Sequence, residues 1–415
     1  MAAEDHDLIV IGAGIVGVSI ALWAQKQGLK VLIADPNTPG SGTTSGSACV
    51  IATYACIPIN SPSVITSLPT LLSSAESPLS FDIMHGLRNP RWMLSFLANC
   101  RPGKVEKISE ALAQILAQAN DGLETLLNDA GAQDLMVSND CMYVSSTRAG
   151  YEASEAGNAL RKKLGVEFDI LGPQEVLELE PELRLPVHRG LRFKGIRHVQ
   201  DPQELVVRLH KHFVALGGTS VQQGVACVQP DQDGVTVHLA DGQEVRAGKC
   251  ALAAGARSGE IKGTGAEKLP LGTERGYHVV YGKQRAKLTR PVGWAEAGFY
   301  ATPMAQGLRV AGTVEIAAVD APFNATRPAY LRRKAEEMFG PLGTPDSEWL
   351  GHRPTMPDAL PVIGTSAKSE HVVFAFGHQH IGLTLGGITG RVVADVVQGR
   401  APTCDISAFA PQRFW

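Results

Sequence analysis

The sequence predicts an α/β fold with a second, α+β lobe. Three observations carry this prediction: the length of 415 residues, the continuous apolar run at residues 8–11, and the glycine-rich turn and helical pattern that follow that run. A chain of this length usually divides into two lobes. A run that is apolar at every position is typical of a parallel strand covered on both faces, so we expect the first lobe to contain a parallel sheet.

The glycine turn, GAGIVG at residues 12–17, has the pattern G-x-G-x-x-G. Residues 15–27 then suit a helix that stops at Gly28, and residues 30–34 predict a second strand that ends in Asp35. The order strand, glycine turn, helix, strand and acid is the complete fingerprint of a Rossmann-like, dinucleotide-binding unit. The alternative is a plain structural turn.

Each part of the fingerprint has a physical role. Gly12 permits the tight turn, Gly14 lets the backbone approach a pyrophosphate, and Gly17 allows close packing of helix on sheet. The helix N-terminus offers free N–H groups and a positive dipole to phosphates. Asp35 is placed to accept hydrogen bonds from the adenosine ribose, so we predict a bound dinucleotide.

A small, hydroxyl-rich segment, GSGTTSGSACVI at residues 40–51, follows the second strand. We call residues 43–49 within it the collar. Backbone and hydroxyl groups of this kind suit a long ligand around which the chain is wrapped, and NAD enzymes seldom need such a segment. The alternative is a flexible Gly/Ser loop.

Composition excludes several functions. The chain has 38 basic and 41 acidic residues and no Lys/Arg run, so we expect no nucleic-acid partner. Its seven cysteines are scattered, without C-x-x-C spacing, which favours reduced thiols in a cytosol over a disulfide framework or a zinc site.

The N-terminus, MAAEDHD, is acidic where a secretory signal is basic, so we expect a cytoplasmic protein. No run reaches the roughly 18 apolar residues of a spanning helix. The apolar stretch WMLSFL at residues 92–97 predicts a buried helix face. Contact with the periphery of the inner membrane, or with a partner, is the alternative.

Further motifs occur along the whole chain: Asp201-Pro202 before a predicted helix, AAGA at residues 253–256 after a strand, GHRPTMPDALPVIG at residues 351–364 and FGHQHIGLTLGG at residues 376–387. Together with the fingerprint and the collar, they resemble the flavin-dependent D-amino-acid oxidase and dehydrogenase superfamily, which includes glycine and sarcosine oxidases. ERGYH at residues 274–278 makes the D-hydroxyproline dehydrogenase branch the most similar in appearance.

The resemblance implies FAD as the cofactor. It is expected to be noncovalent, because residues 351–364 contain no cysteine of the kind that tethers flavin in sarcosine oxidases. Where relatives often carry Asn-Ala-Gly, this chain has Ser47, Ala48 and Cys49. The cofactor contacts that the resemblance implies are Gly12, Ala13, Gly14, Ile15, Val16, Gly17, Asp35, Thr43, Thr44, Ser47, Ala48, Val225, Ala254, Gly255, Gly377, Gly382, Leu383 and Thr384.

Residues 376–387 join a predicted strand to a second helix N-terminus, which the superfamily directs at the flavin pyrimidine edge, where reduced flavin is negative. His378 and His380 would point the same way in extended geometry. They lack a third ligand, so we predict no metal. His380 matches a position near the substrate in glycine oxidase; the alternative is a packed imidazole.

Arg353, in the G-x-R-P motif, is the predicted clamp for a substrate α-carboxylate, which a guanidinium binds bidentately. The alternative is an ion pair between lobes. By resemblance, Tyr300 completes the clamp. Tyr277 or His278, on opposite faces of one predicted strand, lines the pocket, with the core as the alternative for either. The predicted catalytic set is Arg353, Tyr300, Tyr277 and His380.

The functional hypothesis is oxidation of a D-amino acid, of the D-proline or cis-4-hydroxy-D-proline type, to the imino acid by hydride transfer from the α-carbon to FAD. The amine would be neutral, and Arg353 and Tyr300 would place the C–H bond. Alternatives are a glycine/sarcosine-type amine oxidase, an FAD-carrying subunit of a larger dehydrogenase, and an NAD enzyme. The electron acceptor would be a quinone, oxygen or a carrier protein.

For domain organisation we expect an FAD-binding domain from residues 1–85, 198–262 and 350–415. A mixed-sheet substrate domain, residues 86–197 and 263–349, would be inserted between these pieces. Within the inserted part, helical periodicity at residues 104–130 and a strand pattern at residues 299–315 indicate a mixed lobe.

Overall fold

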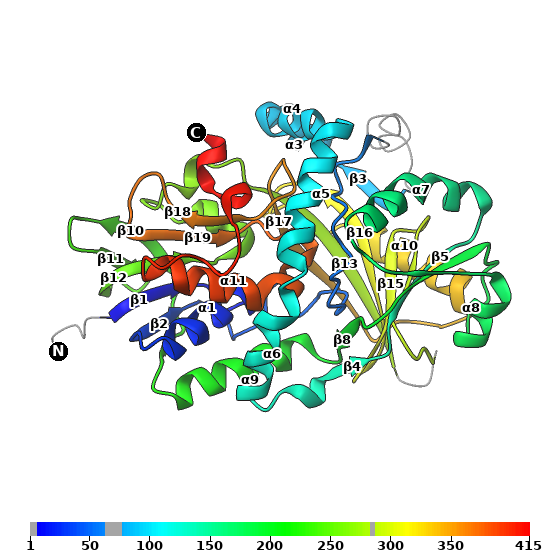
Figure 1. Cartoon of the computed structure of the whole chain (residues 1–415), viewed down its shortest axis with the longest axis horizontal. Helices are drawn as coiled ribbons and strands as arrows, with labels where there is room; N and C mark the ends of the chain where they lie inside the picture. Colours follow the sequence, from blue (N-terminus) through cyan, green and yellow to red (C-terminus); the bar gives the residue numbers. More distant parts are fainter. Residues whose placement is uncertain (1–5, 63–76, 283–286) are drawn as a thin grey trace.

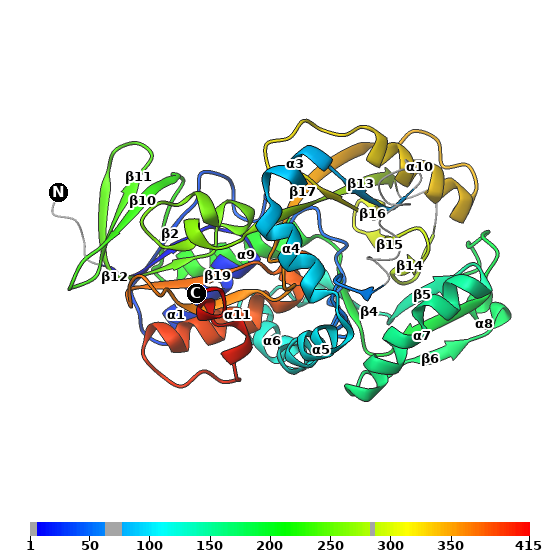
Figure 2. The ribbon, with the colours of Figure 1, turned by 90° about the horizontal axis from the view of Figure 1, so that it is seen from above.

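The computed structural model of the chain describes residues 6–62, 77–282 and 287–415. Two lobes, each built on one large sheet, lie side by side in both views (Figures 1 and 2). A small two-stranded sheet of β4 (Met136–Ser138) and β8 (Arg197–Val199) completes the strands of the described chain. The α/β prediction with a mixed second lobe is therefore confirmed.

The first sheet has eight described strands, in the order β10-β11-β12-β1-β2-β9, with β19 beside β12 and β18 beside β19. The central strands run parallel, from β19 through β12, β1 and β2 to β9. The predicted parallel sheet is thus confirmed. Its strands are β1 (His6–Ile11), β2 (Val31–Ala34), β9 (Thr219–Val221), β10 (Val225–Pro230), β11 (Val235–Leu239), β12 (Glu244–Leu252), β18 (Val362–Thr365) and β19 (Val372–Phe376).

Helices cover this sheet because each has one apolar face, and these faces share a single core with the central strands. Three residues separate β1 from the first helix, which ends two residues before Gly28. The φ of Gly28, +90°, is the left-handed stop that the sequence predicts. The helices are α1 (Ile15–Lys26), α5 (Pro102–Leu116), α6 (Ala119–Asp129), α9 (Pro202–Ala215) and α11 (Gly382–Val397). α5 and α6 confirm the helical pattern at residues 104–130.

The second sheet has nine described strands, in the order β17-β13-β16-β15-β14-β5-β7-β6, with β3 beside β16. One face of β13 carries Tyr277, Val279 and Tyr281, which pack in a core with α10 (Thr326–Phe339). The other face carries Gly276 and His278. The strands are β3 (Leu79–Phe81), β5 (Cys141–Ser145), β6 (Asp169–Leu171), β7 (Arg189–Phe193), β13 (Gly272–Gly282), β14 (Val292–Trp294), β15 (Phe299–Met304), β16 (Gly307–Ile316) and β17 (Ser347–Thr355).

The described strands of the first sheet all fall within the three segments expected for the FAD-binding domain. Four elements lie elsewhere than the expected boundaries put them. β3 joins the second sheet, β17 crosses residue 350, and α5 and α6 pack on α11 of the first lobe. The boundaries themselves stay a prediction.

The apolar stretch at residues 92–97 lies in α4 (Pro90–Asn99), next to α3 (Ile83–Arg88). Phe96 is its buried residue and stacks on Trp92, whereas the Leu94 side chain is 68% exposed. The expectation of a buried helix face is therefore met on the side of α4 that carries Phe96, whereas the side that carries Leu94 is exposed. None of the helices in the described residues is long and apolar enough to cross a membrane.

Candidate active site

The carboxyl ends of β1, β2, β12 and β19 meet at one edge of the first sheet, because these strands are parallel and in register. Gly12, Asp35, Ala253 and Gly377 each follow one of these ends. Open α/β sheets bind ligands at such an edge. The predicted cofactor positions are therefore gathered from four distant parts of the sequence.

The glycine turn after β1 is as crowded as a dinucleotide fingerprint requires. Gly12 has a φ of +114°, and a Cβ there would lie 2.4 Å from the Ala253 carbonyl oxygen. A Cβ on Gly17 would lie 1.9 Å from the Gly12 carbonyl oxygen. Gly14 differs, because the nearest atom to its Cβ would be the Thr44 hydroxyl at 3.5 Å. The chain itself does not require glycine at residue 14, whereas a pyrophosphate against the backbone does.

Asp35 and the collar hold this turn. The Ala13 N–H donates to Asp35 Oδ2 (2.8 Å), and the Ile15 N–H donates to Thr44 Oγ1 (3.3 Å). The N-cap of α1, Gly14, has no side chain to cap the helix, and the first turn has no acidic residue. The positive end of α1 is consequently free to face an anion.

α11 begins beside α1 and runs parallel to it. A Cβ on Gly386 would lie 2.8 Å from the Ile15 side chain, and one on Gly390 would lie 2.6 Å from the Ser19 backbone. Both helix N-termini therefore face the same edge of the sheet. Gly382 is half-buried as the first residue of α11, Leu383 is buried, and the Thr384 hydroxyl accepts from the Ala52 N–H (3.0 Å). These residues fit FAD, which is long and carries a pyrophosphate.

The collar is held from the second sheet. Arg309 Nη1 donates to the carbonyls of Ser45 (2.7 Å) and Ser47 (3.0 Å), and the Thr302 hydroxyl donates to the Ala48 carbonyl (2.9 Å). Cys49 has a φ of +67°, a left-handed conformation that glycine adopts without strain.

The remaining predicted cofactor positions lie on the same edge or near it. Val225 begins β10, and Gly224 before it approaches Pro36, which follows Asp35. Ala254 and Gly255 are half-buried after β12. The Thr43 hydroxyl donates to the His352 carbonyl (2.7 Å), which ties the collar to β17.

Arg353 lies on β17, on the collar side of the second sheet. Its Nη1 donates to the Thr313 carbonyl (2.9 Å), and its guanidinium covers Gly276, where a Cβ would lie 2.3 Å from Nη2. The other guanidinium nitrogens donate to no acceptor among the described residues and are not sealed from solvent. Burial lowers the pKa of Arg353, and Glu274 opposes this effect, but a guanidinium stays charged. Arg353 therefore offers open, charged donors for a carboxylate.

Replacing Gly276 by alanine should displace that guanidinium while leaving the fold intact, because the crowded atom is the end of a flexible side chain. We expect kcat/KM to fall about 10- to 100-fold, as a displacement of roughly 1 Å costs in a catalytic site. The melting temperature should stay near that of wild type. Gly282→Ala, on the same strand but away from Arg353, is the control; equal kinetics for both variants would contradict this account.

Tyr300 lies on β15, where its cross-strand partner Ala311 is two residues before Thr313. Its hydroxyl pairs with the Tyr54 hydroxyl (2.7 Å), and its ring meets the edge of Tyr143 (5.0 Å between centroids). Burial raises the pKa of both Tyr54 and Tyr300, so both phenols stay protonated. The structure brings Tyr300 to the same face as Arg353, with two aromatic residues, Tyr54 and Tyr143, that the sequence analysis missed.

The two histidines do not share an extended segment, so that expectation was wrong. They lie on either side of Gln379 (φ +50°), where η4 (Gln379–Ile381) turns the chain. His378 is 3% exposed, with Nε2 3.0 Å from the Thr389 hydroxyl, whereas His380 is exposed. Desolvation by the surrounding protein lowers the pKa of His380 to about 4, and the positive charge of Arg353 also lowers this pKa. His380 is therefore a neutral imidazole near Arg353.

The structure does not bring Tyr277 to this group. Its side chain is 1% exposed on the opposite face of β13 and donates to Glu315 Oε2 (2.6 Å). His278, on the collar side, has Nδ1 3.2 Å from the Gly46 carbonyl oxygen and stacks on Trp349 (5.0 Å between centroids). Of the two residues considered for the pocket, His278 is the one on the Arg353 face.

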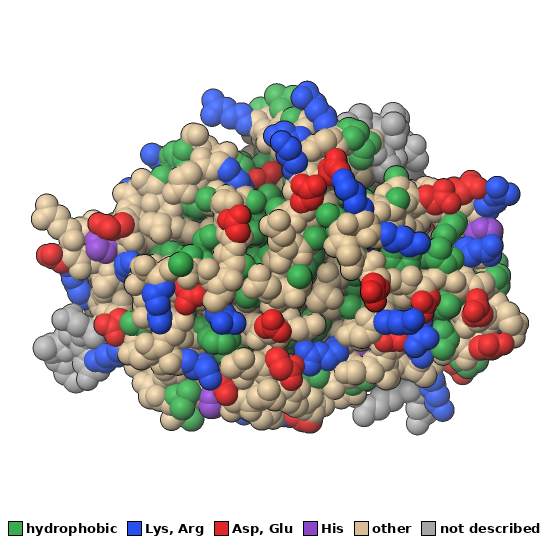
Figure 3. All heavy atoms as spheres, viewed as in Figure 1, with side chains coloured by type: hydrophobic (Ala, Val, Ile, Leu, Met, Phe, Trp, Pro, Cys, Tyr) green, Lys and Arg blue, Asp and Glu red, His purple; other side chains and the backbone are tan. Residues whose placement is uncertain are grey.

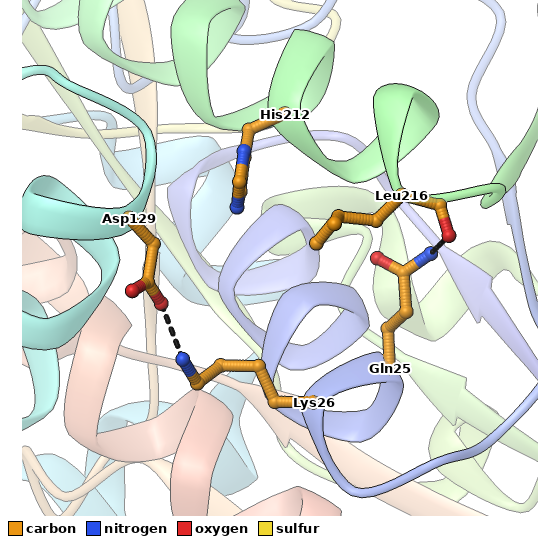
Figure 4. A pocket seen from close by; sticks show the side chains of 5 residues that line it. All are labelled: Gln25, Lys26, Asp129, His212 and Leu216. Atoms are coloured by element: carbon orange, nitrogen blue, oxygen red, sulfur yellow. Dashed lines mark hydrogen bonds and ion pairs between the residues drawn. The ribbon is translucent and has the colours of Figure 1, made fainter.

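Within the described residues, no three His, Cys, Asp or Glu side chains gather as a metal site. A separate surface pocket lies between α1, α6 and α9 (Figure 4), where Lys26 pairs with Asp129 and Gln25 Nε2 donates to the Leu216 carbonyl (3.0 Å). This pocket is at the C-terminal end of α1, about 18 Å along the helix from the glycine turn. It does not belong to the candidate active site.

The family described as FAD dependent oxidoreductase (DAO) matches residues 7–396. A D-amino-acid oxidase of Bradyrhizobium diazoefficiens is 32% identical over 419 residues, covering 99% of each chain. A D-amino acid dehydrogenase of the same organism is 25% identical over 424 residues, covering 98% of each. The crystal structure of glycine oxidase from Geobacillus kaustophilus has a TM-score of 0.76 at 19% identity, covering 98% of each chain, and shares the fold.

Proposed function

Because the chain belongs to the FAD-dependent oxidoreductase family and uses FAD, we propose that it oxidises a D-amino acid of the D-proline or cis-4-hydroxy-D-proline type to the imino acid. The observation that carries the proposal is Arg353. It presents unpaired guanidinium donors on the sheet face that also holds the collar. A fixed cation of this geometry suits the α-carboxylate that amino acids share.

FAD, when bound, supplies the acceptor for the hydride that leaves the substrate α-carbon. Arg353 binds the carboxylate, and the protonated Tyr300 hydroxyl donates a second hydrogen bond to it. Tyr54 fixes the direction of that hydroxyl. His380, as a neutral imidazole, adds no positive charge beside the substrate amine. The chain thus contributes placement more than acid–base chemistry.

The aromatic residues Tyr54, Tyr143 and Tyr300 support a substrate with an apolar ring or side chain, because their rings form a continuous group on this face. Phe193 extends the group by stacking on Tyr54 (4.0 Å between centroids). A cyclic D-amino acid would place its ring against these residues while its carboxylate meets Arg353.

Replacing Tyr54 by phenylalanine tests the role of the tyrosine pair. We expect KM to rise about 2- to 10-fold with kcat little changed, since one net hydrogen bond is worth about 0.5–1.5 kcal/mol. Tyr277→Phe is the matched control: it loses a buried hydrogen bond on the opposite face, so it should lower the melting temperature and leave KM unchanged. If KM rose for Tyr277→Phe and not for Tyr54→Phe, the substrate would bind on the face of the second sheet that carries Tyr277, which would contradict this account.

The substrate is tested by anaerobic bleaching of the visible flavin band against D-proline, cis-4-hydroxy-D-proline, other D-amino acids, glycine, sarcosine and L-amino acids. We expect the cyclic D-amino acids to bleach fastest. Bleaching by glycine or sarcosine instead would keep Arg353 as the clamp and change the substrate. If no amino acid bleached the flavin band, the proposal would be contradicted.

The electron acceptor that we propose is a quinone, oxygen or a carrier protein. Apolar side chains flanked by basic ones cover the region of α3 and α4 (Figure 3), where Leu87 and Leu94 are exposed beside Arg88 and Arg91. Such a surface suits peripheral contact with an anionic membrane. Co-sedimentation of the protein with anionic but not neutral vesicles is the test.

A further inference from the structure

Glu274 is a buried carboxylate beside the proposed carboxylate clamp. It lies on β13 directly opposite Arg353 of β17 in antiparallel register, so the two side chains leave the sheet on the same face. Glu274 is 1% exposed, and neither carboxylate oxygen has a hydrogen-bond partner among the described residues. The nearby Thr355 hydroxyl donates to the Arg353 carbonyl (3.3 Å). A buried, unpartnered carboxylate is costly and calls for a role.

Arg353 interacts with Glu274 through charge and not through contact. Its guanidinium leans over Gly276 and donates to the Thr313 carbonyl, which leaves the Glu274 oxygens without a donor. Burial raises the pKa of Glu274, while the charge of Arg353 and the Thr355 hydroxyl oppose that rise. The charge state of Glu274 therefore depends on how strongly the positive charge of Arg353 stabilises its carboxylate.

The elements packed around Glu274 bring few other charges to its face. On that face His380 is neutral, burial lowers the pKa of His278 to about 3, and Arg309 donates to the collar carbonyls of Ser45 and Ser47. On the opposite face Arg275 and Glu315 pair (3.0 Å). The titratable or charged groups on the neighbouring elements are, on the same face, Arg353 of β17, His278 of β13, Arg309 of β16 and His380 of η4, and, on the opposite face, Arg275 of β13, Glu315 of β16 and His352 of β17. Of these groups, Arg353 is the charge that acts on the pKa of Glu274.

Binding of a carboxylate at Arg353 changes this balance. Two carboxylates would then share one guanidinium in a poorly solvated wall, which leaves a net negative charge there. Protonation of Glu274 by solvent removes that charge, forms one O–H bond and changes no bond of the bound molecule. We propose that Glu274 is the counter-ion of Arg353 in the free enzyme and takes up one proton when the carboxylate of a ligand binds to Arg353. This inference rests on the proposed function, because it takes Arg353 as the carboxylate site.

Proton uptake makes carboxylate binding weaker as the pH rises. Between the two pKa values of Glu274, in the free and in the liganded enzyme, the Kd should increase by up to about tenfold per pH unit. Both values lie above the ordinary one for glutamate, since burial raises the pKa and the ligand charge raises it further. A glutamine at residue 274 cannot titrate, so the Kd should then lose this slope.

The experiment uses the FAD-loaded enzyme and benzoate, a carboxylate that cannot be oxidised at an α-carbon. Binding is followed by the shift of the flavin spectrum, and proton uptake by calorimetry in buffers of different ionisation enthalpy, across the pH range in which FAD is retained. We expect uptake approaching one proton for wild type, the same uptake for His380→Gln, and none for Glu274→Gln.

Benzoate binding without proton uptake in wild type at every pH would overturn the inference and leave the proposed function standing. Uptake kept by Glu274→Gln, or lost by His380→Gln instead, would also overturn it. If Glu274→Gln fails to retain FAD, Glu274→Leu takes its place, since leucine fills the buried position without polar atoms. Absence of benzoate binding, or binding that survives Arg353→Ala unchanged, would contradict both the inference and the proposed function.

Discussion

Replacing Arg353 by alanine should lower kcat/KM for the amino-acid substrate by about 30- to 5,000-fold, which corresponds to about 2–5 kcal/mol for truncating a desolvated charge pair. The loss combines two effects. The substrate carboxylate loses its charged donors, and Glu274, whose oxygens accept no hydrogen bond in the described residues, loses the charge that stabilises its carboxylate. FAD should still bind, because the hydrogen bond that Arg353 makes in the described residues goes to Thr313 and not to the glycine turn or the first turn of α1 or α11.

Two further variants make this prediction specific. Arg353→Lys keeps a charge but not the planar fork, so its kcat/KM should lie between those of wild type and the alanine variant. Arg192→Ala removes a half-buried ion pair with Asp140 on the opposite face of the second sheet, and its kcat/KM should match that of wild type. Wild-type efficiency in Arg353→Ala would show that another group binds the substrate.

Alanine at residues 14 and 17 should separate cofactor binding from folding. Gly17→Ala places a Cβ 1.9 Å from the backbone oxygen of Gly12, which cannot yield without moving α1 from β1, so we expect a protein that folds poorly and holds no FAD. Gly14→Ala meets only the Thr44 hydroxyl at 3.5 Å, so the apoprotein should keep its melting temperature. Its Kd for FAD should rise about 10- to 100-fold, the effect of about 1–3 kcal/mol of overpacking against the pyrophosphate.

The measurement compares melting temperatures of the apoproteins and Kd values for FAD by fluorescence quenching. Gly103→Ala, in the first turns of α5 with open space around its Cβ, is the control and should change neither value. A Gly14→Ala protein that binds FAD as tightly as wild type would place the pyrophosphate elsewhere.

The fold of the first lobe could be predicted from the sequence because the residues that specify it are close together in the chain. β1, the glycine turn, α1 and β2 follow one another within 30 residues, and each glycine there is fixed by contacts with its neighbours. Arg353 was identified by resemblance within a contiguous motif. The alternation on β13 also follows from strand geometry alone, and the structure confirms it.

The second part of the site depends on pairings that no local pattern encodes. Tyr143 and Tyr300 come together because β15 pairs with β14, and β14 pairs with β5, which lies 150 residues away in the chain. Tyr54 joins them through the hydrogen bond between its hydroxyl and that of Tyr300. Glu274 meets Arg353 through the β13–β17 register. The histidine prediction failed because Gln379 adopts a left-handed conformation that an extended reading could not anticipate. Gly386, Gly387 and Gly390 allow α11 to pack against α1 and α6.

The most direct test of the central claim, an amino acid held by its carboxylate at Arg353, compares two reductants under anaerobic conditions. The rate of flavin bleaching is measured by rapid mixing with the best D-amino acid, D-proline in our proposal, and with its carboxamide, in wild type and in Arg353→Ala. We predict fast bleaching of wild type by the acid, slow bleaching by the amide, and no preference in the variant. Equal bleaching of wild type by the acid and the amide would contradict the claim.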